Sequence, residues 1–319
     1  RKGVAEATLK AAQGKIPVIV HVGTADSLSA ARLTEHAVQC GAAAVAAVGP
    51  YYFKHSSEDI CDYFHTLVDA AKGRVPVYVY NNPQFQGYPM ELELIRTLKE
   101  KVGVSGVKDA TFDIQAMAKY MRLLKSDAFD VALGTEAMWL PACVLGCKAF
   151  IPGIGNAFPE ICRKMFSEGM AGDIKACRKT QFEVNEMRDI MYLARSTQLA
   201  IYAMLELRGI VKCYPRRPFV PATQEEKEKI KIRLKELGLL LTAIAIPHTS
   251  KLNRGLHYEN WQTDCFGPCS NGFYKRPSGR LLRRFRFRKQ RGAGRLRRFG
   301  RRRTGRLYPE SGRGDPPVA

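Results

Sequence analysis

The chain has 319 residues, 45% of them apolar, which allows one large domain or two ordinary ones with a sizeable core. Its net charge of +21 is uneven: residues 250–319 contain 19 Lys and Arg against 4 Asp and Glu, a net +15, and the preceding 249 residues have only +6. The main part is therefore an ordinary, mildly basic globular protein, and the lack of 18 consecutive uncharged apolar residues excludes a membrane span.

Strands and helices are predicted to alternate along the main part of the chain. The sequence opens inside a helix, RKGVAEATLKAAQG, so we expect an N-terminal segment to be missing. Continuous apolar runs predict strands buried on both faces. These strands are expected at residues 16–23, 42–50, 75–83, 102–110, 129–134 and 147–153. The helices between them are expected at residues 27–40, 57–72, 90–101, 113–125 and 136–146.

With their apolar cores starting at Ile16, Ala43, Val75 and Val104, the first four predicted strands recur every 27–32 residues, the length of one strand and one crossover helix. Such a series fits a (β/α)₈ barrel or a doubly wound sheet. No G-x-G-x-x-G motif follows a strand, which favours the barrel. We count about six of the eight βα units and take the first two to be absent. A barrel that lacks two of its eight units is not expected to be a competent enzyme by itself.

The C-terminal half divides into two parts. Residues 160–240 are expected to be helical, ending in TQEEKEKIKIRLKELGLL, so residues 1–240 form the partial barrel domain with its C-terminal helices. Residues 241–319 read as a basic, low-complexity tail, rich in Arg and Gly and poor in aliphatic side chains. We expect this tail to be disordered, or to result from a frameshift or a fused gene.

The cysteines favour a reducing compartment, and hence the cytoplasm. They are odd in number and lie mostly in apolar helical contexts. No pair among them has partners at spacings that complete four zinc ligands, so no metal site is expected. The nine are Cys40, Cys61, Cys143, Cys147, Cys162, Cys177, Cys213, Cys265 and Cys269.

Two reactive side chains stand at the ends of neighbouring predicted strands. In a barrel the active site lies at the C-terminal ends of the strands, where Tyr80 and Lys108 fall one βα unit apart. Burial would favour the neutral amine of Lys108, the nucleophile that forms an imine with a ketone, and a phenol beside it could relay protons. The alternatives are a solvent-facing lysine, or one paired with Asp109, and an aromatic core residue.

Four segments, GPYYFK, YVYNNP, GVKDAT and LGTEAMWLPACVLG, resemble the dihydrodipicolinate synthase / N-acetylneuraminate lyase family of class I aldolases. The resemblance covers about residues 1–240. It favours catalytic roles for Lys108 and Tyr80 over a solvent-facing or Asp109-paired lysine and an aromatic core residue. It implies a homotetrameric barrel that handles pyruvate through a lysine imine, with no other cofactor. Lys108 matches the Schiff-base lysine and Tyr80 the proton-relay tyrosine. Tyr52 matches a second relay tyrosine, which a neighbouring subunit supplies in the synthase branch.

The resemblance also implies substrate-binding positions. Gly134 and Glu136 match the substrate-lining loop after the seventh barrel strand, and Gly153 and Ile154 match the floor after the eighth. Phe85 stands where the synthase branch has an arginine that grips the carboxylate of the aldehyde substrate. Phenylalanine cannot make that bidentate contact.

Two further departures from the family keep the substrate open. Ala137 replaces one member of the acidic pair found in the sialic-acid lyase branch. The loop that holds the pyruvate carboxylate would lie before Arg1. The chain is therefore predicted to be a pyruvate-dependent carbon–carbon lyase acting on a 2-oxo acid or sugar acid of unknown identity.

Three other functions remain open. The chain could be a dihydrodipicolinate synthase or an N-acetylneuraminate lyase proper, or an inactive fragment. The basic segment at residues 275–306 could instead bind nucleic acid through phosphate contacts, although it contains no recognisable nucleic-acid-binding motif.

Overall fold

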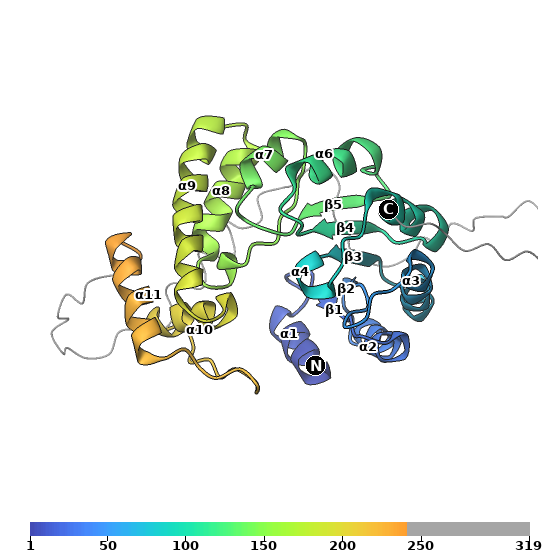
Figure 1. Cartoon of the computed structure of the whole chain (residues 1–319), viewed down its shortest axis with the longest axis horizontal. Coiled ribbons are helices and arrows are strands. Elements are labelled where there is room, and N and C mark those ends of the chain that lie inside the picture. Colours follow the sequence, from blue (N-terminus) through green and yellow to red (C-terminus); the bar gives the residue numbers. More distant parts are fainter. Residues whose placement is uncertain (241–319) are drawn as a thin grey trace, which may run out of the picture. The chain divides into compact units, whose positions relative to one another are not determined.

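The computed structural model describes residues 1–240 (Figure 1). The strands are β1 (Ile19–His21), β2 (Ala44–Val48), β3 (Val77–Asn81), β4 (Gly106–Asp109) and β5 (Asp130–Leu133). The α-helices are α1 (Lys2–Ala12), α2 (Ser27–Gln39), α3 (Ser57–Ala71), α4 (Pro83–Gln86), α5 (Leu92–Thr97), α6 (Ile114–Leu123), α7 (Trp139–Val144), α8 (Pro159–Met170), α9 (Ile174–Ile190), α10 (Thr197–Leu207) and α11 (Gln224–Glu236). A π-helical turn, η1 (Leu98–Val102), and two 3₁₀ turns, η2 (Ile154–Asn156) and η3 (Met191–Leu193), complete the elements.

The strands form one parallel sheet in the order β1-β2-β3-β4-β5, so every strand pairs with its neighbour in sequence. A doubly wound sheet reverses direction at a switch point, and no reversal occurs in this part of the chain. The sequential order is that of a (β/α)₈ barrel, which confirms the predicted fold class. Five paired strands are fewer than the eight that close a barrel, and β1 forms an edge of the described sheet.

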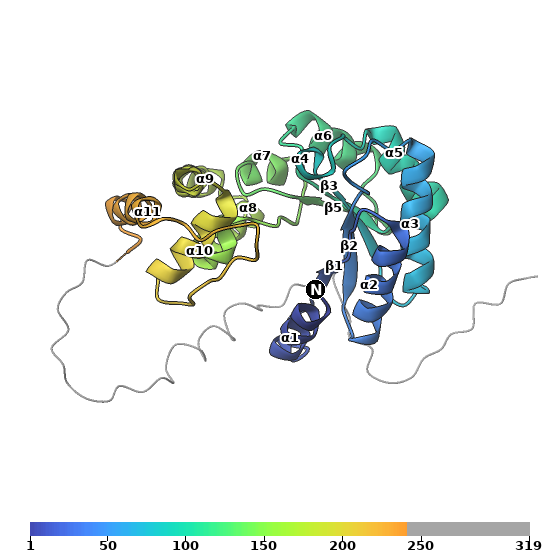
Figure 2. The ribbon, with the colours of Figure 1, turned by 60° about the horizontal axis from the view of Figure 1, so that its bottom comes forward.

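Helices cover only one face of the sheet, and the two faces differ in burial. Figures 1 and 2 show α2, α3, α5 and α6 following one another along the same side. In β3, Val77, Val79 and Asn81 are buried on that side, whereas Tyr78 and Tyr80 are half-buried on the other. The prediction of strands buried on both faces was therefore wrong for this strand, because the described chain supplies no cover for the inner face.

The sixth predicted strand, 147–153, is reduced to a single parallel bridge between Phe150 and Leu133 of β5. The amide of Leu133 donates to the carbonyl of Ala149 at 2.9 Å, and the amide of Ile151 donates to the carbonyl of Leu133 at 2.9 Å. Pro152 then interrupts the run, because it lacks the N–H that would extend the ladder.

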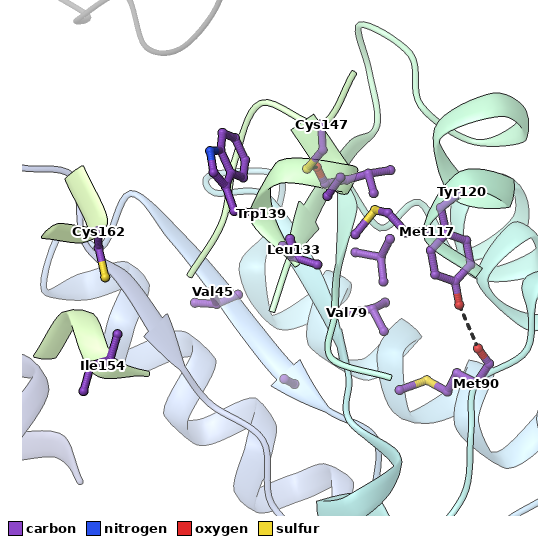
Figure 3. Close-up of a cluster of buried hydrophobic side chains, with 14 of the residues drawn as sticks. Val45, Val79, Met90, Met117, Tyr120, Leu133, Trp139, Cys147, Ile154 and Cys162 are labelled. Atoms are coloured by element: carbon purple, nitrogen blue, oxygen red, sulfur yellow. Dashed lines mark hydrogen bonds between the residues drawn. The ribbon is translucent and has the colours of Figure 1, made fainter. Parts of the chain in front are cut away.

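The core lies between the sheet and its helices and continues into the C-terminal helices (Figure 3). Val79, Met117 and Leu133 are buried on the covered face of the sheet. Trp139 of α7 is fully buried, stacks on Phe150 at a centroid distance of 4.9 Å, and donates its indole N–H to the carbonyl of Met165. This stacking fixes the segment that follows β5.

Local sequence signals place the helix ends close to the predicted positions. Ser56 and Asp59 form a capping box at the start of α3, and Thr223 and Glu226 form one at the start of α11. α7 begins three residues later than predicted, at Trp139, because the preceding residues form the loop described below. The predictions for the tail from residue 241, including the segment 275–306, lie outside the described residues.

Candidate active site

Lys108 and Tyr80 meet at the C-terminal ends of two neighbouring strands. The register of β3 and β4 pairs the two residues directly. The Nζ atom of Lys108 lies 3.8 Å from the ring centroid of Tyr80. Both side chains are half-buried on the uncovered face of the sheet. The structure thus brings together the two residues that the sequence predicted to meet.

The amine of Lys108 is easier to deprotonate than an ordinary lysine. Burial lowers its pKa to about 8, and the carboxylate of Glu136 opposes this shift by favouring the charged form. About half of the Lys108 side chains are therefore neutral at pH 8, whereas an exposed lysine is almost wholly charged there. A neutral amine on an accessible strand end is a nucleophile for carbonyl carbon.

The hydroxyl of Tyr80 is held by a neighbouring amide that the sequence analysis did not single out. The Nδ2 atom of Asn82 donates to the Tyr80 oxygen at 3.0 Å. Burial raises the pKa of Tyr80, and this hydrogen bond partly counteracts the shift. The phenol therefore stays protonated at neutral pH. Because Asn82 is the donor, the phenolic proton remains available for another acceptor.

His21 is a second residue that the sequence analysis missed. Its ring meets that of Tyr80 edge-on, with centroids 6.2 Å apart, and its Nε2 accepts the amide N–H of Val48 at 3.2 Å. Burial, then Arg1, then Lys108 lower the pKa of His21 to about 4, so the imidazole is neutral. The acceptor role of Nε2 assigns the proton to Nδ1. The only sequence signal was a polar residue at the end of an apolar run.

A buried ion pair between Glu136 and Arg188 acts on the charge of Lys108. Glu136 is only 2% exposed, and its Oε2 accepts the amide N–H of Gly153 at 2.7 Å. The Nε atom of Arg188, on α9, lies 3.2 Å from Oε1 as an ion pair without hydrogen-bond alignment. The Arg188 guanidinium also lies 5.1 Å from the ring centroid of Phe112 and donates to the Tyr192 hydroxyl at 2.9 Å. Arg188 thus offsets the negative charge that acts on the lysine.

The predicted substrate-lining residues fall into two groups. The amide of Gly134 donates to the carbonyl of Asp109 at 2.6 Å, and a Cβ at Gly134 would lie 2.6 Å from the same oxygen. Only glycine fits so close a strand end. Gly153 adjoins Glu136, as described. The side chain of Ile154 is fully buried in the core, so it could contribute to a site only as part of its wall (Figure 3).

Tyr52 and Phe85 stand apart from the lysine. Tyr52 follows β2, is 87% exposed, and packs its ring edge-on against Phe53. Its φ of 87° is a left-handed conformation that costs a non-glycine residue roughly 1–3 kcal/mol. Phe85, on α4, is 66% exposed. Within residues 1–240 neither ring stacks on Tyr80 or lies under the Lys108 amine.

The sequential parallel sheet and its covering helices define an α/β barrel-type fold, and comparison with known proteins shows an enzyme of the aldolase and lyase class. Residues 1–237 match the Dihydrodipicolinate synthetase family. The chain therefore belongs to that family.

Curated relatives match most of the main part of the chain. The 4-hydroxy-tetrahydrodipicolinate synthase of Methanopyrus kandleri is 28% identical over 238 residues, covering 74% of this chain and 78% of the relative. The enzyme of the same name from Desulfotalea psychrophila is 30% identical over 240 residues, covering 75% and 80%.

Solved structures extend the likeness to two named activities. A Ruminococcus gnavus sialic acid aldolase, described as a catalytic lysine mutant, is 26% identical with a TM-score of 0.70, covering 75% of this chain and 78% of that one. A putative dihydrodipicolinate synthetase from Pseudomonas aeruginosa is 29% identical with a TM-score of 0.68, covering 74% and 80%. Among the described helices, none combines the length and apolar character needed to traverse a bilayer.

Proposed function

We propose that the chain is a carbon–carbon lyase that binds pyruvate, or a related 2-oxo acid, as an imine on Lys108. The observation that carries this proposal is the half-buried Lys108 amine, whose Nζ lies 3.8 Å from the centroid of the Tyr80 ring. The solved relative described as a catalytic lysine mutant of sialic acid aldolase supports a lysine-based reaction. No other cofactor is required, because the lysine itself supplies the electron sink.

The proposed reaction begins with attack of neutral Nζ on the keto carbon. The resulting carbinolamine loses water to give the imine, and loss of a proton from the adjacent carbon gives an enamine. The enamine carbon adds to the carbonyl carbon of an aldehyde, and hydrolysis releases the product and free Lys108. The reverse sequence cleaves the same carbon–carbon bond. Tyr80 donates its phenolic proton to the departing hydroxyl and recovers one in the later step.

The surrounding residues hold this pair ready. Asn82 orients the Tyr80 hydroxyl. His21 is neutral, so it adds no positive charge that would lower the pKa of Lys108 further. Glu136 keeps a fraction of the amine protonated, with Arg188 limiting that effect. In this proposal Gly134, Gly153 and Ile154 form the wall beside the bound acid.

The acceptor is proposed only as an aldehyde of a 2-oxo-acid or sugar-acid product. Relatives named as 4-hydroxy-tetrahydrodipicolinate synthases and as a sialic acid aldolase represent two different acceptors. Phe85 has no positive charge with which to bind the carboxylate of an aldehyde substrate. Ala137 has no carboxylate, whereas the sialic-acid lyase branch has an acidic residue at that position. A cytoplasmic homotetramer in which Tyr52 reaches a neighbouring subunit remains part of the proposal. One solved relative is described as a monomeric dihydrodipicolinate synthase variant, so assembly must be measured.

Borohydride trapping with pyruvate tests the lysine directly. In a version of the chain extended by the N-terminal segment of a longer relative, we expect one reduced pyruvate adduct, located on Lys108 by peptide mass spectrometry and lost in Lys108→Met. The 319-residue chain should be tested beside it, since an adduct in the extended chain alone would support the inactive-fragment alternative. An adduct on another residue, or none on Lys108 in either version, contradicts the proposal.

Phe85 allows the acceptor to be tested separately. Without the arginine of the synthase branch, we expect turnover of aspartate semialdehyde to be lower than in the synthases by roughly 30-fold to several thousand-fold. Phe85→Arg should raise this turnover and leave pyruvate trapping unchanged, because the side chain at this position is 66% exposed and is proposed to act only on the acceptor. Synthase-like turnover by the unmodified chain would exclude this account of its specificity.

A further inference from the structure

Three side chains of types that bind metal ions lie together where α1 meets α2, in a part of the sequence well before Lys108. They are Glu6 of α1 and His36 and Cys40 of α2. His36 and Cys40 are one helical turn apart, so both side chains lie on the α2 face that meets α1. The side chain of His36 is 14% exposed and that of Glu6 is 57% exposed. The cluster is therefore partly sheltered and still open to ions.

A carboxylate oxygen and a thiol sulfur both approach the same nitrogen of the imidazole. The Oε1 atom of Glu6 lies 2.7 Å from His36 Nε2. The Cys40 Sγ lies 3.5 Å from Nε2 and 4.0 Å from Nδ1, so it too approaches Nε2. A single N–H at Nε2 can point along only one of these two directions. A cation placed between the three atoms would satisfy them together.

The distances fit a tetrahedral zinc ion. With Zn–N of about 2.05 Å and Zn–S of about 2.3 Å, tetrahedral ligands are separated by roughly 3.5 Å, which matches the Nε2–Sγ distance. The corresponding N–O separation is roughly 3.3 Å, so Glu6 would have to withdraw by roughly 0.6 Å from its present contact. Glu6 is an exposed, flexible side chain and can make this movement.

α1 has few other attachments that would make such a tie redundant. None of its residues is buried. Arg1, immediately before it, donates to the backbone carbonyls of Gly23 and His21 at 2.8 Å each. The contact between Glu6 Oε1 and His36 Nε2, at 2.7 Å, links α1 to α2. A ligand bridging the same residues would fix the helix much more firmly.

We propose that Glu6, His36 and Cys40 form a binding site for zinc, or a divalent cation of similar preference, with water as the fourth ligand. Thiolate, imidazole and carboxylate are all established zinc ligands. Binding releases the Cys40 thiol proton to solvent and leaves the His36 ring proton on Nδ1. The ion acts as a clasp between α1 and α2 and does not take part in the lysine chemistry.

α3 provides a matched control within the same chain. Cys61, His65 and Asp69 again combine a thiol, an imidazole and a carboxylate, here at four-residue spacing, and His65 Nδ1 lies 3.2 Å from an Asp69 oxygen. Among the described residues these three do not gather into a metal-sized group, unlike the α1–α2 cluster. Helical spacing alone is thus insufficient, and Cys61→Ser tests for nonspecific thiol binding.

Cobalt titration of the reduced, tag-free full chain tests the proposal. The unmodified chain and Cys61→Ser should develop a near-ultraviolet cobalt–thiolate charge-transfer band, and Cys40→Ser should lose it. Zinc should displace the cobalt. His36→Gln should weaken binding by more than about 100-fold, because it removes a direct ligand. A band that is absent from the unmodified chain, or unchanged in Cys40→Ser, overturns the proposal.

Limited trypsin digestion supplies a readout of the clasp itself. Lys10 lies in the last turn of α1 and is a natural cleavage site. Zinc should slow cleavage at Lys10 in the unmodified chain and in Cys61→Ser, but not in Cys40→Ser. Equal protection in Cys40→Ser would show that zinc acts elsewhere, and the proposed site would then be wrong.

Discussion

The two faces of the sheet use the same strands for different purposes. On the covered face, Val79, Val107 and Leu133 are fully buried under helices. On the other face, Tyr80 and Lys108 are half-buried and contact each other. The first set contributes stability through loss of contact with water, and the second retains polar groups whose burial is unfavourable. A single residue step along a strand therefore separates packing from chemistry.

The largest effect should come from removing one hydroxyl on the uncovered face. Tyr80→Phe is expected to lower the rate of imine formation or carbon–carbon cleavage by about 10²–10⁴-fold, because it removes the proton relay. Tyr78→Phe is the matched control, since Tyr78 lies on the same face of β3 and its hydroxyl donates to Asp130 at 2.9 Å. Single-turnover kinetics would separate the two. Equal rate losses would mean that the face matters only through its packing.

Val107 and Lys108, adjacent residues of β4 on opposite faces of the sheet, should differ in their contribution to the free energy of unfolding. Val107→Ala should lower the free energy of unfolding by roughly 1–3 kcal/mol, because a fully buried side chain loses its contacts. Lys108→Met should cause no loss at pH 7, because it removes a charge that burial disfavours. Denaturant titration of both variants measures the difference.

The lysine substitution also has a predicted pH dependence. Folding lowers the pKa of Lys108 from 10.5 to about 8, so the penalty for burying its charge is complete below pH 8. The penalty falls as pH rises above 8 and is absent above 10.5. The stability advantage of Lys108→Met should therefore shrink over that interval. An advantage that stays constant with pH would show that the lysine charge is not desolvated.

The smallest predicted effect concerns the charges behind the site. Arg188→Gln leaves Glu136 without its cationic partner, so the carboxylate should favour charged Lys108 more strongly. The midpoint of pyruvate trapping against pH should rise by roughly one unit. Arg178→Gln, an exposed position on the same helix, should leave the midpoint unchanged. If neither variant shifts the midpoint, Arg188 does not influence the pKa of Lys108.

Part of the site could be predicted from the sequence because it depends on short-range order. Parallel strands that follow one another in a barrel are neighbours in the sheet, so one βα unit was enough to place Tyr80 beside Lys108. The family resemblance added Glu136 and Gly153, which the structure joins by a hydrogen bond. The roles of these residues, and of Tyr52 and Phe85, remain predictions.

The sequence by itself determined the alternation of strands and helices, the fold class and the meeting of Tyr80 with Lys108, because each depends on local periodicity and chain order. Only the tertiary structure decided that the uncovered face stays half-buried and that the strand predicted at 147–153 contracts to the Phe150 bridge. It also brought His21 and Arg188 to the site from distant segments. Their positions depend on how separate elements pack, and no local pattern encodes which distant side chain will pair with a buried charge.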